Sequence, residues 1–260
     1  MIGLFDSGVG GLTVLTEVRL LAPTADLFYI ADQAWAPYGE RSLDELQTRT
    51  GRISEVFIAR GVGVVVLACN TASAAALHWL RRRYPQVQFV GMEPAVKPAA
   101  SITSTGTIGV LATTSTFQGE LFASVVDRFS DGVKVITQSC PGLADLVERG
   151  IDRGVEAEAL LARYLEPIIA AGADTVVLGC THYPFLIKLI HQIVGPSVNV
   201  IDPAPAVARQ TVKVSKELGV LGEGSITELA TTGDPAAFER VAAHLAGLSE
   251  PVGVLPLPEQ

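Results

Sequence analysis

Two cysteines are the residues of this chain whose type and placement most clearly indicate chemistry. Cys69 and Cys180 each follow a continuous apolar run and precede a short polar segment. A run of this kind predicts a buried strand, so each thiol is expected at the carboxyl end of a strand, where a helix begins. At such a helix N-terminus we expect the helix dipole to lower the pKa of the thiol, which makes both side chains candidate acid/base groups.

The two cysteines stand at equivalent positions in a repeated sequence. Residues 2–5 (IGLF) recur as residues 108–111 (IGVL), and residues 65–69 (VVLAC) recur as residues 176–180 (VVLGC). A free cysteine is often only a packed core residue, but packing gives no reason to place one at the same strand end in both halves. We therefore expect two similar lobes that face each other and bring the two thiols to opposite sides of one ligand.

Opposed acid/base groups suit the inversion of a carbon centre. One group removes a proton from one face of the carbon, and the other returns a proton to the opposite face, whereas a single base would return it to the face it left. The pair therefore predicts a racemase that needs no cofactor. The cysteines and histidines show no metal-ligand spacing, so no metal site is predicted.

Short β-branched runs alternate with longer helical stretches, which predicts an α/β fold with mainly parallel sheets in two pseudo-symmetric lobes and an active site in the cleft between them. The first lobe is expected to comprise residues 1–98 and 209–260, and the second lobe residues 99–208. The tail should return to the first lobe with a strand and a helix capped by Asp234 and Pro235. A (β/α)8 barrel is the second choice. The expected strands are residues 2–5, 27–30, 63–68, 87–91, 107–112, 133–137, 174–179, 198–201 and 228–231.

Polar residues gather next to the same predicted strand ends. Asp6 and Ser7 open a glycine-rich turn whose N–H groups could hold an anion, a nucleotide being the weaker alternative. Thr113 and Thr116 follow the equivalent strand of the second lobe, where they either bind a carboxylate or cap a helix. Asp6 and His182 could hold or pass a proton beside the neighbouring thiols. The other candidates flank the cysteines or lie in a Pro-Tyr-Gly turn: Asn70, Thr71, Thr181, Tyr38 and Gly39.

The composition argues against several classes of protein. Lys and Arg number 19 against 27 Asp and Glu, and the resulting net charge of -8 argues against nucleic acid as a partner. No apolar run reaches the roughly 18 residues needed to span a membrane. The N-terminus lacks the features of a signal peptide, so we expect a cytoplasmic protein.

The third cysteine, Cys140, has no counterpart at an equivalent strand end and is predicted to be structural.

With these residues in place, the chain resembles the cofactor-independent, two-cysteine racemases of aspartate and glutamate, and its His-Tyr-Pro continuation is similar to the glutamate branch. The motifs that carry the resemblance run along nearly the whole chain: DSGVGG at 6–11, PYG at 37–39, VLACNTAS at 66–73, GCTHYP at 179–184 and TTGD at 231–234. The resemblance implies glutamate racemisation, which supplies D-glutamate for bacterial peptidoglycan. It also implies that Cys69 and Cys180 are the two proton donors and acceptors.

The same resemblance implies which residues surround the substrate. Asp6 and His182 would assist their neighbouring cysteines, and Glu148 would be a further acid/base residue. Substrate contacts would fall on Asp6, Ser7, Tyr38, Gly39, Asn70, Thr71, Thr181 and His182. The expected partner is therefore the small molecule glutamate. A homodimer is compatible with the sequence, which does not set the oligomeric state.

Three other functions stay open at this point. A racemase for aspartate or another amino acid would share the paired cysteines. A non-catalytic two-lobed protein that binds an anionic amino acid would fit the lobes, but it gives no reason for cysteine at both strand ends. A thiol redox protein would need cysteines that pair or are resolved by another thiol.

Overall fold

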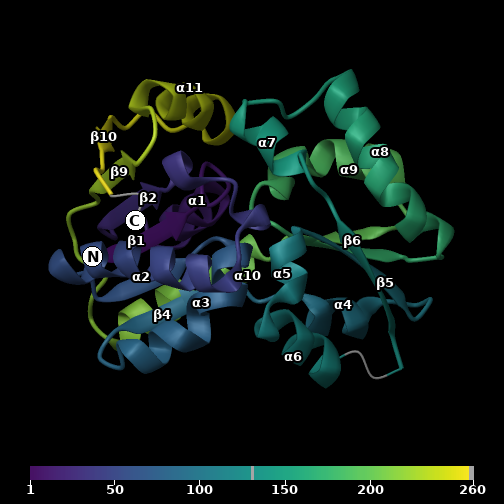
Figure 1. Cartoon of the computed structure of the whole chain (residues 1–260), viewed down its shortest axis with the longest axis horizontal. Helices are drawn as coiled ribbons and strands as arrows, with labels where there is room; N and C mark the ends of the chain where they lie inside the picture. Colours follow the sequence, from purple (N-terminus) through teal and green to yellow (C-terminus); the bar gives the residue numbers. More distant parts are fainter. Residues whose placement is uncertain (130–131, 258–260) are drawn as a thin grey trace.

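The chain forms two lobes, each built around its own parallel β-sheet (Figure 1). The computed structural model describes residues 1–129 and 132–257. The sheet of the first lobe has the strand order β10-β9-β2-β1-β3-β4, and the sheet of the second lobe has the order β6-β5-β7-β8. Neighbouring strands pair in parallel throughout both sheets. The strands are β1 (Ile2–Asp6), β2 (Leu27–Ala31), β3 (Val64–Leu67), β4 (Gln88–Gly91), β5 (Thr107–Ala112), β6 (Lys134–Ser139), β7 (Thr175–Gly179), β8 (Asn199–Ile201), β9 (Thr227–Thr231) and β10 (Val252–Val254).

This arrangement confirms the predicted α/β class with two lobes and mainly parallel sheets. Each predicted run coincides with a strand, and the tail strand β9 pairs with β2 of the first lobe. The barrel alternative is wrong, because the strands form two separate sheets. The sequence did not predict β10, which is short and mostly exposed and therefore lacks the apolar run that marks a buried strand.

Helices cover both faces of the first sheet. Neighbouring residues of β1 show this, since Leu4 belongs to the buried cluster that contains Leu15 of α1, whereas Phe5 belongs to the cluster that contains Phe57 of α2. None of the helices in the described residues is both long and apolar enough to cross a membrane. The helices are α1 (Leu12–Leu21), α2 (Leu43–Ala59), α3 (Asn70–Arg83), α4 (Val96–Ile102), α5 (Thr114–Gln118), α6 (Glu120–Phe129), α7 (Leu143–Glu148), α8 (Val155–Ala170), α9 (Ile187–Val194), α10 (Ala204–Glu217) and α11 (Pro235–Ala246), with short 3-10 helices η1 (Gln33–Trp35), η2 (Tyr38–Glu40) and η3 (Tyr183–Leu186).

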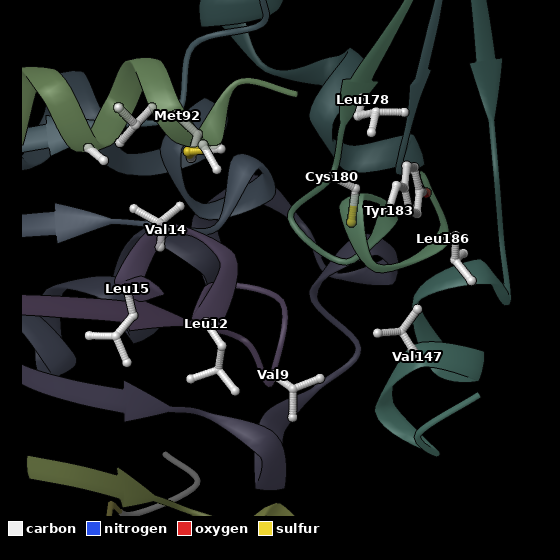
Figure 2. Packing of buried hydrophobic residues seen from close by; sticks show 14 of the residues in the cluster. Val9, Leu12, Val14, Leu15, Met92, Val147, Leu178, Cys180, Tyr183 and Leu186 are labelled. Carbon is white, nitrogen blue, oxygen red and sulfur yellow. The ribbon is translucent and has the colours of Figure 1, made fainter. Parts of the chain in front are cut away.

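The connection between the lobes runs through both the core and the backbone. One buried apolar cluster continues from α1 of the first lobe to Leu178, Tyr183 and Leu186 of the second, next to Cys180 (Figure 2). Helix α10 follows β8 of the second lobe and packs against α1 of the first. The division of the chain that we propose, with boundaries at residues 98 and 208, separates the two sheets, and α10 runs across the second boundary.

Several helices begin directly after strand ends, and this places the candidate residues at one edge of each sheet. Cys69 is the N-cap of α3, and its side chain accepts a hydrogen bond from the backbone N–H of Ala72. Thr113 is the N-cap of α5 and accepts from the N–H of Thr116. Asp234 caps α11, which begins at a proline, as the sequence predicted. The carboxyl ends of β3 and β5 therefore present a thiol and a hydroxyl at the edges where the lobes meet.

Candidate active site

A cavity between the two lobes collects residues that follow the strands of both sheets. Cys69 of the first lobe and Cys180 of the second both line it. The other predicted site residues on its wall are Ser7, Tyr38, Gly39, Asn70, Thr71, Thr113, Glu148, Thr181 and His182. Two further predicted residues, Asp6 and Thr116, are buried behind the wall. The fold thus brings the two thiols to one cavity, as the repeat in the sequence predicted.

The Cys69 thiol is almost fully buried at the end of β3. Its Sγ accepts a hydrogen bond from the N–H of Ala72 at 3.4 Å and lies 4.0 Å from Ser7 Oγ. Burial, followed by the charge of Asp6, raises the pKa of Cys69 to about 12. The predicted lowering of this pKa is wrong, because the loss of hydration outweighs the hydrogen bond from the start of α3.

The Cys180 thiol has a different environment, in which an imidazole and a carboxylate lie next to it. Its Sγ is 3.6 Å from His182 Nδ1, and His182 Nε2 is 2.6 Å from Glu148 Oε1. Burial opposes the charged imidazole, but the contacts with Cys180 and Glu148 outweigh it and raise the pKa of His182 well above its usual value. Burial likewise opposes the Glu148 carboxylate, but the hydrogen bond and charge of His182, together with the hydrogen bonds from Gln33 and Val9, outweigh it and lower the pKa of Glu148. The second thiol of the cavity therefore lies beside a protonated imidazole that a carboxylate holds in place.

Glu148 also ties the two lobes together. Its Oε1 accepts a hydrogen bond from the N–H of Val9 at 2.7 Å, and its Oε2 accepts one from Gln33 Nε2 at 2.8 Å. Both donors belong to the first lobe, whereas Glu148 is the last residue of α7 in the second. Gly8 allows this close approach, because a Cβ atom at that position would overlap the Glu148 carboxylate.

We therefore expect Gly8→Ala to lower activity. The added methyl group must push the Glu148 carboxylate away from His182, and a displacement of about 1 Å in such a site can cost about 10²-fold in kcat/KM. Racemisation followed by polarimetry would measure the loss. Gly253→Ala is a matched control, because a Cβ there would meet its nearest neighbour at an ordinary 3.8 Å. Equal activity of the two variants would contradict the role given to this contact.

Asp6 joins the lobes at a second point. Its Oδ1 accepts a hydrogen bond from the N–H of Gly8, and its Oδ2 accepts one from Thr181 Oγ1, both at 2.9 Å. Asp6 is fully buried, and burial raises its pKa. The carboxylate therefore acts on the cavity through Thr181 and through its charge, which bears on Cys69.

Three threonine hydroxyls form a hydrogen-bonded triangle where the lobes meet. Thr71 Oγ1 lies 2.9 Å from Thr113 Oγ1 and 3.2 Å from Thr116 Oγ1, and the last two oxygens are 2.9 Å apart. Thr113 caps α5 with this oxygen and also lines the cavity. Capping therefore does not remove Thr113 from the candidate site, whereas Thr116 lies one layer behind it.

Apart from the imidazole of His182, the hydrogen-bond donors that the described residues offer to the cavity are neutral groups. The amide of Asn70 is buried on its wall, and neither amide atom has a hydrogen-bond partner within the described residues. Because buried polar groups are normally paired, this amide is available to a polar ligand. No lysine or arginine stands among the described lining residues. An anionic ligand must therefore be held by N–H groups, hydroxyls, amides and the imidazolium of His182.

Part of the cavity wall was not predicted from the sequence, including Cys140. Strand β6 extends to Ser139, so Cys140 directly follows the carboxyl end of a strand. Its position shortly after the sixth predicted strand could have indicated that it lines the cavity. Its structural role stays a prediction. Within residues 1–129 and 132–257, no three His, Cys, Asp or Glu residues are grouped as metal ligands would be. The other lining residues not predicted are Ala36, Pro37, Glu40, Thr114, Ser139, Pro141, Gly142, Ala144 and Asp145.

Comparisons with known proteins agree with this geometry. The family model described as Asp/Glu/Hydantoin racemase matches residues 13–211. A glutamate racemase from Roseiflexus sp. (strain RS-1) is 51% identical over an alignment of 249 residues that covers 94% of this chain and 91% of that protein. The crystal structure of a glutamate racemase isoform from Bacillus anthracis matches with a TM-score of 0.90 at 32% identity, covering 100% of this chain and 98% of that one. A glutamate racemase from Francisella tularensis, in complex with D-glutamate, matches with a TM-score of 0.86 at 25% identity, covering 98% and 97% of the two chains.

Proposed function

Because the chain belongs to the Asp/Glu/hydantoin racemase family and, within it, to the glutamate racemases, we propose that it is a cofactor-independent isomerase that interconverts L- and D-glutamate. The observation that carries the proposal is the cavity lined by thiols from equivalent strand ends of the two lobes. The D-glutamate complex of the Francisella tularensis relative supports glutamate as the substrate. The reaction would supply the D-glutamate that bacterial peptidoglycan contains.

The proposed reaction consists of two proton transfers at Cα. A thiolate on one side removes the Cα proton and becomes a thiol, which leaves a planar carbanionic centre. The thiol on the opposite side donates its proton to that centre and becomes a thiolate. The amino acid leaves as the other enantiomer, and the two sulfurs have exchanged protonation states. The next turnover can therefore start from the opposite face.

The environments of the two thiols support different starting protonation states. The protonated imidazole of His182, held by Glu148, stabilises a negative charge on Cys180. Cys69, with a pKa of about 12, carries its proton at neutral pH. We therefore assign Cys180 as the base and Cys69 as the acid in the free enzyme. The ammonium group of a bound amino acid would lower the pKa of Cys69 and allow the reverse direction.

The two carboxylates of glutamate would be held by groups that carry no full positive charge, apart from His182. The first N–H groups of α3 add positive partial charge on the Cys69 side. Donors of this kind also stabilise the charge that develops as the Cα proton leaves. Asp6 and Thr116 support the wall from behind. The proposed substrate-binding residues on the wall are Ser7, Tyr38, Gly39, Asn70, Thr71, Thr113, Thr181 and His182.

Glutamate is the only partner that we propose. The net charge of -8 supports the absence of a nucleic-acid partner, since a phosphate backbone would be repelled. The expected independence from membranes and the cytoplasmic location stay predictions. A homodimer also stays a prediction, and sedimentation equilibrium would check it.

Isotope exchange tests the proposed reaction directly. In D2O, L-glutamate should yield D-glutamate with one deuteron at Cα, because the returned proton comes from a thiol in exchange with solvent. Aspartate offered under the same conditions should react far more slowly. Turnover of aspartate with none of glutamate would contradict the assignment of substrate. Tight glutamate binding without exchange would indicate a binding protein, and loss of free thiols on mild oxidation without racemisation would indicate a redox protein.

A further inference from the structure

A buried ion pair lies beneath the loop that forms one wall of the cavity. Arg49 on α2 is 3% exposed, and Asp32, directly after β2, is fully buried. Arg49 Nε donates to Asp32 Oδ2 at 2.8 Å, and Arg49 Nη2 donates to Asp32 Oδ1 at 2.6 Å. Removing two charges from water usually costs about as much as such a pair returns in stability. The pair therefore points to a role in fixing position more than to one in stabilising the fold.

The Asp32 carboxylate connects Arg49 to the cavity wall. Besides Arg49, it accepts hydrogen bonds from Tyr38 Oη at 2.6 Å and from Thr232 Oγ1 at 2.8 Å. Burial, followed by the charge of Asp32, raises the pKa of Tyr38 well above its usual value, so the phenol keeps its proton and remains a donor. Tyr38 lines the cavity. One carboxylate thus orients a wall residue against a fixed guanidinium.

Tyr38 in turn belongs to a segment that touches the second lobe. A Cβ atom at Gly39 would lie 2.9 Å from Thr113 Cβ, so the backbone of the loop packs directly on this threonine. Ser115 Oγ donates to the carbonyl oxygens of Gly39 and Arg41 at 2.8 and 3.0 Å. The loop is therefore held from one side by the first lobe and from the other by α5. Movement of Tyr38 would therefore displace Gly39 and the Thr113 side chain on which Gly39 packs.

We propose that Arg49 is a positioning residue for substrate binding, which acts through Asp32 on Tyr38 and thereby fixes the wall formed by Tyr38 and Gly39. The inference rests on the glutamate racemase activity proposed above. Arg49 does not stand among the described residues that line the cavity, so it has no contact with the reacting atoms. It should therefore determine how tightly glutamate is held and leave the proton transfers at Cα unchanged.

Single substitutions can separate this role from a purely structural one. Arg49→Lys keeps the charge but loses the two-point geometry of the guanidinium. Tyr38→Phe keeps the ring and the buried ion pair but removes the hydroxyl that donates a hydrogen bond to Asp32. Each variant should raise KM for glutamate about tenfold, the effect of one lost hydrogen bond, with kcat changed by less than about threefold. Both changes break the same chain of hydrogen bonds from Arg49 through Asp32 to Tyr38. The double variant should therefore raise KM no further than the more affected single variant.

The ion pair between Arg60 and Glu228 supplies a matched control. It lies in the same lobe and has the same 2.6 Å separation, but its side chains are 47% and 45% exposed. Arg60→Lys should therefore leave KM and kcat unchanged, because an exposed pair contributes little. Steady-state kinetics with L- and with D-glutamate on all four variants and the unmodified enzyme make up the experiment.

The outcomes are distinguishable. A rise of KM in both single variants that does not add in the double variant supports the proposal. Unchanged KM, a loss confined to kcat, or KM effects that multiply in the double variant would overturn it. If Arg49→Lys does not fold, Tyr38→Phe and the Asp32→Asn/Arg49→Gln double variant, in which both charges are removed, provide the test. A raised KM with kcat nearly unchanged in both would support the proposal, and any other result would overturn it. An unmodified enzyme that fails to racemise glutamate would refute the proposed function instead.

Discussion

Replacing either Cys69 or Cys180 by serine is expected to abolish racemisation and to leave hydrogen exchange on one face of the substrate. Serine keeps a hydroxyl of similar size, but it does not ionise near neutral pH and so cannot alternate between base and acid. Racemisation should fall by about 10³-fold, within the range for loss of a general acid or base. The remaining thiol can still remove the Cα proton and return a deuteron to the same face. In D2O, Cys69→Ser should therefore exchange one enantiomer with retention, and Cys180→Ser should exchange the other.

Proton NMR of each pure enantiomer in D2O would follow this exchange. Cys140→Ser is the matched control, because Cys140 is a third buried thiol on the same cavity wall that receives no role in proton transfer. It should racemise glutamate normally. If the Cys69→Ser and Cys180→Ser variants exchanged the same enantiomer, or if either kept full racemisation, two opposed thiols could not be the acid and the base.

Replacing His182 by asparagine is expected to slow only the proton transfers that use Cys180. L- and D-glutamate have equal free energies in solution, so kcat/KM must be the same in both directions and the single variant cannot distinguish the faces. The cysteine variants separate them. Added to Cys69→Ser, His182→Asn should slow exchange about 10²-fold, because Cys180 loses the imidazolium 3.6 Å from its sulfur. Added to Cys180→Ser, the same change should alter exchange by less than about threefold. Equal effects in both backgrounds would contradict the assignment of His182 to Cys180.

The pH profile of Glu148→Gln provides a check on the same unit. Contact with Cys180 and Glu148 raises the pKa of His182 well above its usual value against the opposing effect of burial, so the imidazolium persists at neutral pH and is lost only as the pH rises through that raised value. Glutamine keeps the shape of the side chain but removes the charge, which should lower the pKa of His182. The alkaline limb of kcat/KM should then move to lower pH. An unmoved alkaline limb would show that Glu148 does not control this ionisation.

Much of the fold was predictable because it depends on local patterns. The apolar runs that end before Cys69 and Cys180 marked buried strands, and their repetition indicated two lobes and a shared ligand between them. Asp234 followed by proline marked the start of α11 in the same way. Edge strand β10 lacked such a pattern and was missed. Local sequence therefore indicated where strands and helices begin and which chemistry stands at their ends.

The properties of the site depended on contacts that no local pattern contains. The helix N-terminus at Cys69 predicted a lowered pKa, yet burial and the charge of Asp6 raise it to about 12. Glu148 meets Val9, 139 residues away along the chain, and it lies next to His182 only because α7 packs against η3. Hydration, charge and hydrogen bonding at a buried atom sum over every neighbour in space. The sequence therefore predicted the two thiols and the reaction they suit, whereas packing between the lobes determines the burial, the charges and the hydrogen bonds around each sulfur.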